Sequence, residues 1–246
     1  MKNYLHVILL LLLLPMAGAE AQIRKPQNKP YIDLRPMHFG ICIGLNMQDI
    51  EFENIGPQLL DDGTERTVVC DADTWNPGFS VGVVADMRLN DYLNFRIAPS
   101  LHFGSKRLVF RDFEMLNESG KPTETTQDLK NTYIALPLEL KYGAERFNNY
   151  RPYMIAGVSP MINLAGKDQE YVQLKRFDTM IEVGLGCDFY LPFFKFIPEL
   201  KFCYGLGNVL NKDHVNELTD VNKKLYAQSV ASASPSKLFV ISFYFE

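Results

Sequence analysis

The feature that most constrains the fold is an alternation of large apolar residues with small or polar residues. In residues 37–47 every odd position is large and apolar, from Met37 to Met47, while every even position is small or polar. Successive side chains of a β-strand point to opposite faces, so this period of two indicates a strand with one apolar face. The chain is therefore expected to be all-β.

The same alternation returns in seven further segments along the chain, which are residues 79–90, 93–104, 134–143, 153–164, 177–189, 196–207 and 238–245. It blurs only between Tyr153 and Leu164, where both faces contain apolar residues, and the facing of that strand stays open. Strands of about 10 to 14 residues are longer than those of soluble sheets and match a tilted strand that crosses a bilayer. The strand lengths favour a membrane barrel.

The connections between these strands alternate between long and short. The long ones span about 48–76, 105–131, 165–175 and 208–236, and the short ones lie at 90–92, 144–149 and 191–193. An up-and-down topology places all long connections at one end and all short ones at the other, as in bacterial outer-membrane barrels. The prediction is an eight-stranded antiparallel up-and-down transmembrane β-barrel with four long extracellular loops and short periplasmic turns.

The polar face of the strands decides which side points outward. A soluble, lipocalin-like barrel would carry lysine, glutamate and threonine on its exterior, whereas this face is rich in glycine, alanine and serine. Small residues suit a narrow interior, because an eight-stranded barrel has only enough room for side chains to fill. The charged residues on the same face are of mixed sign, and burial requires them to pair. We expect an interior charge network of Asp86, Arg88, Arg96, Glu139, Lys141, Glu182, Asp188, Glu199 and Lys201.

Aromatic residues lie near the ends of the strands. Such residues form girdles at the two membrane interfaces of outer-membrane barrels. The expected girdle residues are Phe79, Tyr92, Phe103, Tyr142, Phe177, Phe189, Tyr204, Phe239 and Phe245.

The first residues have the pattern of a secretory signal peptide. Lys2 supplies the positive start, residues 5–14 the apolar core, and Ala19 to Ala21 a cleavage site before Gln22. A membrane anchor is the weaker alternative, because the apolar run is too short to span a bilayer as a helix. The expected organisation is a signal peptide in 1–21, a periplasmic N-terminal segment in 22–35 and an outer-membrane β-barrel in 36–246, with periplasmic termini.

Composition excludes two other classes of protein. A content of 47% hydrophobic and 22% charged residues excludes a disordered chain. A net charge of −4 lacks the basic surplus that phosphate binding requires, so no nucleic acid partner is expected. The expected surroundings are the lipids of the outer membrane.

Candidate chemistry in the strands is sparse. Ser100 and His102 share the inward face of one strand, which could seed a hydrolase site, but no nucleophile motif flanks them. They are more simply polar residues in a packed lumen. His38 and His102 lack the closely spaced cluster of ligands typical of a metal site. We therefore expect no catalytic, cofactor or metal site and no small-molecule substrate.

Four cysteines in an exported chain allow three disulfide pairings. Cys187 falls on the apolar face, Cys42 and Cys203 fall on the inward face, and Cys70 lies in the first long connection. A bridge between Cys42 and Cys203 would have to cross the lumen, because the last strand separates their two strands. Mostly free thiols are expected.

Three stretches carry a resemblance to a known family, namely residues 37–46, 96–104 and 176–178 together with 182–186. In these stretches, and over nearly the whole mature chain, the sequence resembles the PorT family of outer-membrane β-barrel proteins. The resemblance implies a component needed for type IX protein secretion. One departure is the end of the last strand, where Glu246 follows the aromatic Phe245 that would otherwise close the chain.

A lumen filled by its own side chains cannot pass a polypeptide. The expected function is therefore to support type IX secretion as an assembly, stabilising or docking component together with other secretion components, not as the conduit. The long loops offer a possible contact surface with Phe52, Trp75, Phe110 and Phe113, unless they are merely solvated and variable. Two alternatives stay open: a structural or adhesion barrel unrelated to secretion, and a barrel hydrolase acting on lipid or peptide.

Overall fold

A computed structural model describes residues 26–59, 63–72, 76–118, 120–164, 171–218, 220–233 and 235–246. The expected signal peptide with its cleavage site at Ala21 and Gln22 lies outside the described residues, and so does Trp75. None of the helices in the described part of the chain is long and apolar enough to cross a membrane.

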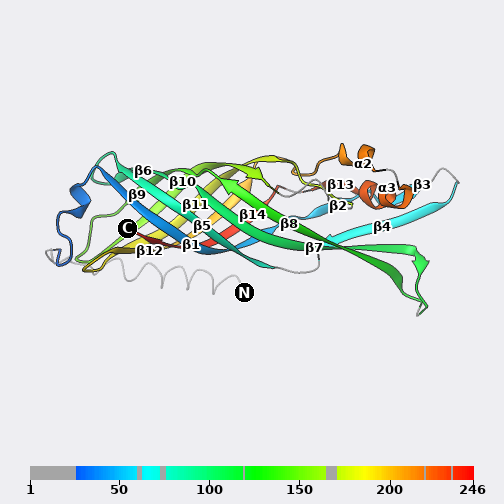
Figure 1. Cartoon of the computed structure of the whole chain (residues 1–246), viewed down its shortest axis with the longest axis horizontal. Helices are drawn as coiled ribbons and strands as arrows, with labels where there is room; N and C mark the ends of the chain where they lie inside the picture. Colours follow the sequence, from blue (N-terminus) through cyan, green and yellow to red (C-terminus); the bar gives the residue numbers. More distant parts are fainter. Residues whose placement is uncertain are drawn as a thin grey trace, which may run out of the picture.

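The chain forms a closed antiparallel barrel with eight strand positions in its wall, as predicted (Figure 1). We call each of these positions a stave. Two staves consist of two consecutive strands each, and β14 closes the barrel by pairing with both β1 and β12. In chain order the staves are β1 (Met37–Asp49), β5 (Pro77–Arg88), β6 (Leu93–Ile97) with β7 (Ser100–Leu116), β8 (Pro122–Ala135) with β9 (Leu138–Gly143), β10 (Tyr150–Asn163), β11 (Phe177–Tyr190), β12 (Lys195–Gly205) and β14 (Lys237–Phe245).

A proline lies at the point where each of two staves is divided. Pro99 separates β6 from β7, and Pro137 separates β8 from β9, because proline has no N–H to donate to a neighbouring strand. The carbonyl groups still bond, since Val83 N donates to Pro99 O at 3.0 Å and Ala98 N donates to Pro137 O at 3.2 Å. The pairing register continues across both interruptions, so each stave acts as one strand.

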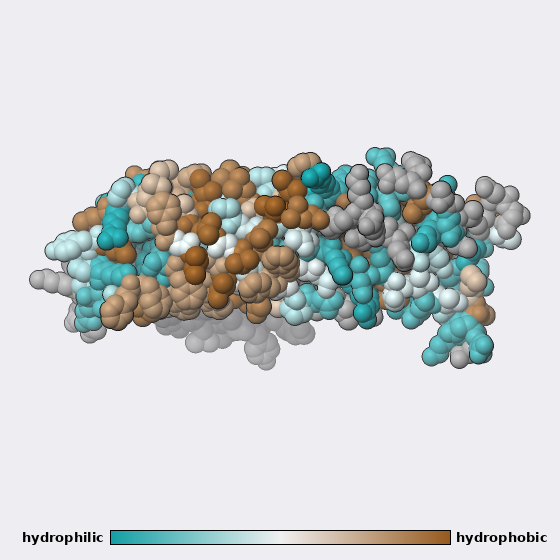
Figure 2. Space-filling view, in the orientation of Figure 1, coloured by the Kyte–Doolittle hydropathy of each residue, from teal (hydrophilic) through white to brown (hydrophobic). Residues whose placement is uncertain are grey.

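The barrel faces the way the alternation predicts. Phe39 and Leu185 point outward and are 67% and 58% exposed, whereas the polar face is buried in the lumen. Figure 2 shows the resulting band of apolar residues on the visible face of the barrel. In β10, whose facing the sequence left open, Met154 points outward while Tyr153 and Ser159 lie buried inside.

Aromatic side chains lie near both ends of the barrel wall. Phe79 and Phe103 are neighbours across β5 and β7. Near the short turns, the rings of Tyr92 and Tyr142 lie 6.5 Å apart. This arrangement agrees with the expected girdles.

The two ends of the barrel differ. Short turns and the C-terminus gather at one end, the turn end, on the left of Figure 1. The 3₁₀ helix η2 (Ile32–Leu34) also lies there. The long connections project from the opposite end.

Three of the four long connections contain secondary structure in their described residues, which refines the expectation of long loops. They contain β2 (Phe52–Asn54), β3 (Pro57–Leu59), β4 (Glu65–Ala72), α2 (His214–Glu217), α3 (Val221–Gln228) and β13 (Val230–Ala233). The segment 105–131 continues β7 and β8 as a hairpin well beyond the apolar band. The alternation inverts there, since Ser105 and Arg107 point outward while Leu108 and Phe110 point inward. A strand that leaves a bilayer for water needs this reversal, because its outward face then meets water. A search for strands with outward apolar residues therefore misses this extension of β7 and β8.

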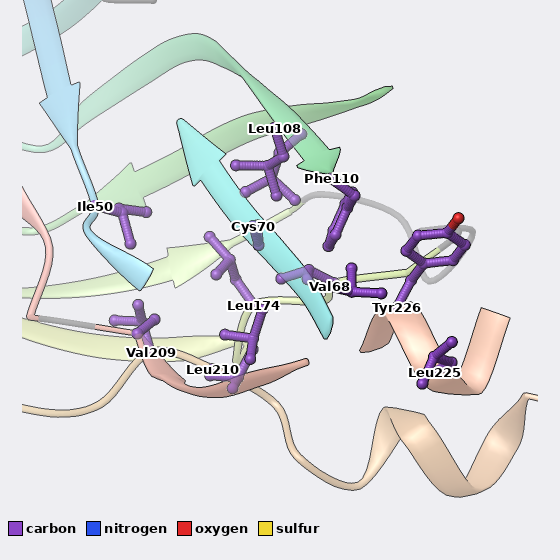
Figure 3. Packing of buried hydrophobic residues seen from close by; sticks show 14 residues of the cluster. Ile50, Val68, Cys70, Leu108, Phe110, Leu174, Val209, Leu210, Leu225 and Tyr226 are labelled. Atoms are coloured by element: carbon purple, nitrogen blue, oxygen red, sulfur yellow. The ribbon is translucent and has the colours of Figure 1, made fainter. Parts of the chain in front are cut away.

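All four long connections share one hydrophobic core (Figure 3). The first contributes Ile50, Val68 and Cys70, the second Leu108, Phe110 and Leu129, the third Val172 and Leu174, and the fourth Val209, Leu210, Leu225, Tyr226, Val230 and Ala233. We call this unit the head; it comprises the described residues of 50–72, 105–130, 171–174 and 208–233. The barrel interior holds two separate apolar clusters.

Candidate functional site

Arg96 forms the centre of the charge network in the lumen. Its side chain is fully buried, and Nη1 donates to Glu199 Oε2 at 2.7 Å. Nε and Nη2 lie 3.4 and 3.3 Å from Asp86 Oδ2. A buried arginine requires such partners, because an unpaired ion in a medium of low dielectric constant is costly.

Two tyrosines complete the surroundings of Arg96. The hydroxyl groups of Tyr153 and Tyr244 both donate to the Glu199 carboxylate, the latter at 3.0 Å. Their ring centroids lie 5.4 and 5.0 Å from the Arg96 guanidinium carbon, within the range of cation–π attraction. Glu199 thus accepts hydrogen bonds from three buried side chains.

A second group of charges surrounds Lys201. Its Nζ donates to Glu139 Oε1 at 2.8 Å and lies 3.5 Å from Glu182 Oε2 and 3.7 Å from Glu199 Oε1. Because Glu199 also pairs with Arg96, the two groups form one continuous network.

A third group extends the network to the turn end. Lys141 Nζ contacts both oxygens of Asp188, at 2.7 and 2.9 Å, and lies 3.7 Å from Asp86. Lys195 Nζ donates to Glu246 Oε2 at 2.6 Å and lies 3.6 Å from Asp188. The charged side chains therefore connect opposite walls of the barrel in the half next to the turn end.

The structure places eight of the nine expected residues in this network and excludes one. Arg88 lies at the mouth of the turn end and pairs with Asp91, whose side chain is 75% exposed. It has the inward parity of its strand but sits at the last position, where the lumen opens to water. Its assignment to the interior network is therefore wrong.

The sequence did not identify four members of the network: Tyr153, Lys195, Tyr244 and Glu246. The inward orientation of Lys195 could not be assigned because the residue directly follows a turn. That of Tyr153 could not be assigned because its strand has apolar residues on both faces. Glu246 lies two residues after Tyr244 and therefore points to the same inward face. This spacing was the signal in the sequence that could have identified it. Its side chain is 2% exposed.

The N-terminal segment closes the turn end of the barrel. Asn28 donates from its backbone N to Asn149 Oδ1 at 3.0 Å and from Nδ2 to Tyr190 O at 2.9 Å. Asp33 accepts from Tyr190 at 2.6 Å and from Arg146 Nη1 at 3.0 Å. These contacts hold residues 28–34 across the mouth.

The half of the lumen next to the head holds the candidate hydrolase residues. The imidazole of His102 lies between two hydroxyl groups, with Ser80 Oγ 2.8 Å from Nδ1 and Ser100 Oγ 3.1 Å from Nε2. Asn46 Nδ2 donates to Ser80 Oγ at 2.8 Å. Ser80 is 1% exposed and His102 is 8% exposed. The geometry is that of hydrogen-bonded polar residues packed inside a lumen, remote from any substrate outside it.

The remaining candidate groups are metal ligands and thiols. Among the described residues, no group of histidine, cysteine and carboxylate side chains could hold a metal ion. All four cysteines are free, which confirms the expectation from their facing. Burial raises the pKa of the Cys70 thiol in the head to about 12.

The expected contact surface of the head needs correction. Phe113 is 49% exposed and fits the expectation. Phe110 is fully buried, with its ring 5.3 Å from Tyr171 and 5.7 Å from Tyr226, so it belongs to the core and cannot contact a partner. Phe52 is partly buried against the same core.

Paired amide hydrogen bonds fix the connections of the head to one another. Gln127 Nε2 donates to Val172 O and Val172 N donates to Gln127 Oε1, both at 3.0 Å, which joins the second connection to the third. Asn54 and the Cys70 backbone exchange an equivalent pair within the first connection, at 3.1 and 2.7 Å. Strands β2 and β13 join the first connection to the fourth. The head is therefore a built unit whose exposed residues have fixed positions.

Residues 21–211 match the family described as outer membrane protein beta-barrel domain. The chain belongs to this family. Membership of the outer membrane protein beta-barrel domain family agrees with the closed barrel and its apolar band, and it supports a location in the outer membrane. Among curated proteins, no sequence matches this chain.

Two solved structures of membrane barrels are similar to this one. Neisserial surface protein A (NspA) shares 12% identity at a TM-score of 0.42, over 86% of this chain and 97% of NspA. Ail, the attachment invasion locus protein of Yersinia pestis, was solved in complex with the heparin analogue sucrose octasulfate. It shares 12% identity at a TM-score of 0.37, over 86% of this chain and 99% of Ail. Similarities of this size carry nothing about function.

Proposed function

We propose that this protein is a non-conducting, non-enzymatic outer-membrane barrel that supports type IX protein secretion as an assembly, stabilising or docking component. The observation that carries the proposal is the filled lumen. Arg96, Glu139 and Glu199 are fully buried at its centre, joined by ion pairs to opposite walls. A polypeptide could pass only if this network were broken and its charges left unpaired, which would cost several kcal/mol per ion.

The head supports the docking part of the proposal. It has its own core, its connections are joined by paired hydrogen bonds, and it stands clear of the apolar band. Side chains fixed on a rigid scaffold lose less entropy on binding than side chains of a mobile loop. The head is thus the part of the molecule best suited to hold a partner.

The proposed orientation places the head outside the cell and the turn end in the periplasm. Outer-membrane barrels of this class have short periplasmic turns and longer segments outside. The N-terminal segment and the C-terminus then lie on the periplasmic side. This assignment is part of the proposal.

The link to type IX secretion rests on the resemblance to the PorT family in residues 37–46, 96–104 and 176–178 together with 182–186. The experiment is to delete the gene and to profile the proteins exported to the medium and the cell surface. The expected result is the loss of cargo that carries type IX C-terminal signals, with export restored by the wild-type gene. Unchanged export of that cargo would contradict the proposal and favour an adhesion or structural role.

A further inference from the structure

A groove of 650 Å³ lies in the head between three of its connections. One wall is β3, and residues 171–173, residues 210–212, the end of α3 and the start of β13 complete the lining. Figure 1 shows β3 beside α3 at the far end of the head. The volume lies in the range of ordinary ligand sites.

The wall formed by β3 is the edge of a sheet. In the described part of the chain, β3 pairs with β4 and is the last strand in the order of the large sheet. An edge strand presents N–H and C=O groups that another strand can pair with. Ile55 and Leu59 on this wall are 55% and 78% exposed, so apolar side chains flank the free edge.

Amide side chains line the groove beside the apolar ones. Gln58 Nε2 is buried and has no hydrogen-bond partner among the described residues. Gln173 uses its Oε1 to accept from Asn211 at 2.7 Å. Because Gln58 Nε2 has no surface open to the groove, the amide that a ligand can reach is that of Gln228, which is exposed and offers both a donor and an acceptor.

The charge of the groove further limits the ligand. Lys212 is the one charged side chain among the residues that line it, and it forms no ion pair with the described residues. The lining therefore suits a ligand that is mainly uncharged and carries one carboxylate. A phosphate-rich ligand would need several cations.

The aromatic residue of the groove argues against a carbohydrate. Carbohydrate sites use the open face of an aromatic ring, but the ring of Tyr171 packs within the core of the head. Its centroid lies 5.3 Å from that of Phe110 and 5.4 Å from that of Tyr226. A strand edge, an exposed amide and apolar side chains instead match an extended polypeptide.

We propose that this groove binds an extended peptide segment of a partner protein, with its backbone beside β3 and a carboxylate facing Lys212. The peptide would pair its backbone with the edge of β3 and place apolar side chains on the surface next to Leu59. The inference rests on the proposed function, since it gives the docking role of the head a site and a class of partner.

The test selects random peptides of about ten residues, displayed on phage, on the purified full-length protein in detergent micelles. The expected result is a set of β-prone peptides with a shared acidic position. The best of them, made synthetically, should bind Leu59→Asp about tenfold more weakly than wild type. Leu116→Asp is the matched control, because Leu116 is 61% exposed in the hairpin of β7 and β8 and does not line the groove. Equal effects of the two substitutions, or no selected peptides, would overturn the inference.

Two further measurements test how the peptide is held. Methylating alternate backbone nitrogens of the peptide should abolish binding if it pairs with β3 as a strand. Lys212→Glu should weaken the binding of the acidic peptide. It should strengthen the binding of a peptide that has lysine in place of the shared acidic residue. Unchanged binding after methylation, or displacement of the peptide by a neutral oligosaccharide, would contradict the inference.

The same variants separate this inference from the proposed function. If Leu59→Asp loses the peptide but type IX export continues even in the deletion strain, the groove stands and the proposed function fails. If the deletion strain loses export but wild-type protein selects no peptide, the proposed function stands and the groove inference fails.

Discussion

Glu246 and Lys195 face each other across the end of the barrel and exchange three hydrogen bonds. Lys195 Nζ donates to Glu246 Oε2 at 2.6 Å, and the two backbones bond in both directions at 2.7 and 3.0 Å. Glu246, which follows the aromatic Phe245, therefore belongs to the interior charge network. Phe245 keeps its outward position in the strand before it.

The substitution Glu246→Ala should destabilise the barrel. It removes the nearest partner of Lys195 and leaves that buried ammonium with Asp188 at 3.6 Å, while the backbone ladder remains. The expected loss is about 2 to 4 kcal/mol in the free energy of unfolding, measured by urea titration in detergent micelles. Glu124→Ala is the control, since Glu124 pairs with Arg111 on the surface of the head. Equal losses in the two variants would contradict the burial argument.

Arg96→Met and Arg88→Met distinguish an arginine inside the network from one at its edge. Arg96→Met removes the nearest cation of both Asp86 and Glu199 in the closed lumen and leaves them only Lys141 and Lys201, each at 3.7 Å, so we expect a loss of about 3 to 5 kcal/mol. Arg88→Met breaks an ion pair that is open to water and should cost less than about 1 kcal/mol. Urea unfolding followed by the migration of unboiled protein on gels gives both values. A large loss in Arg88→Met would return Arg88 to the network.

Phe110→Ala should open the head and leave the barrel closed. Removing this fully buried ring from between Tyr171 and Tyr226 costs about 3 to 5 kcal/mol, which falls on the head because the barrel has its own apolar clusters. The expected result is rapid proteolysis of the head, with unchanged heat-modifiable migration of the barrel. Phe113→Ala serves as the control, because Phe113 is exposed and its loss changes little. Protease resistance of Phe110→Ala equal to that of wild type would contradict a cooperative head core.

Cys70 should resist alkylation for as long as the head is folded. Its pKa is raised to about 12 by burial, so at pH 8 almost no thiolate is present to attack iodoacetamide. Mass spectrometry of the labelled peptide should show no modification of Cys70 in native protein and full modification after denaturation. A variant with Phe113→Cys provides an exposed thiol that should react in the native state. Fast labelling of native Cys70 would show that the first connection does not pack as described.

The barrel could be predicted from the sequence because a bilayer imposes a simple rule on each strand. Within the apolar band the outward residues are mostly apolar, as at Phe39 and Leu185, and the inward ones must fit a narrow lumen, so the period of two is strong enough to show in a single sequence. The same rule identified the residues of the charge network through their parity. It failed at Arg88, because parity does not show how far along the barrel the lumen stays closed.

The head could not be predicted in the same way. Its core joins residues such as Val68, Leu129 and Leu225, which are far apart in the sequence and have no common period. Its connections depend on amide pairs, as between Gln127 and the Val172 backbone, and no sequence pattern announces such a pair. The groove beside β3 exists only because three connections meet there.

The central claim is that the lumen is closed by its own charge network, so that the protein acts through its head and not as a conduit. The most direct test is the conductance of purified wild-type protein in a planar lipid bilayer. We expect no steady current steps from the wild-type protein under an applied voltage, and a measurable conductance from a double variant with Arg96→Gly and Glu199→Ala. Reproducible open channels in the wild-type protein would contradict the central claim.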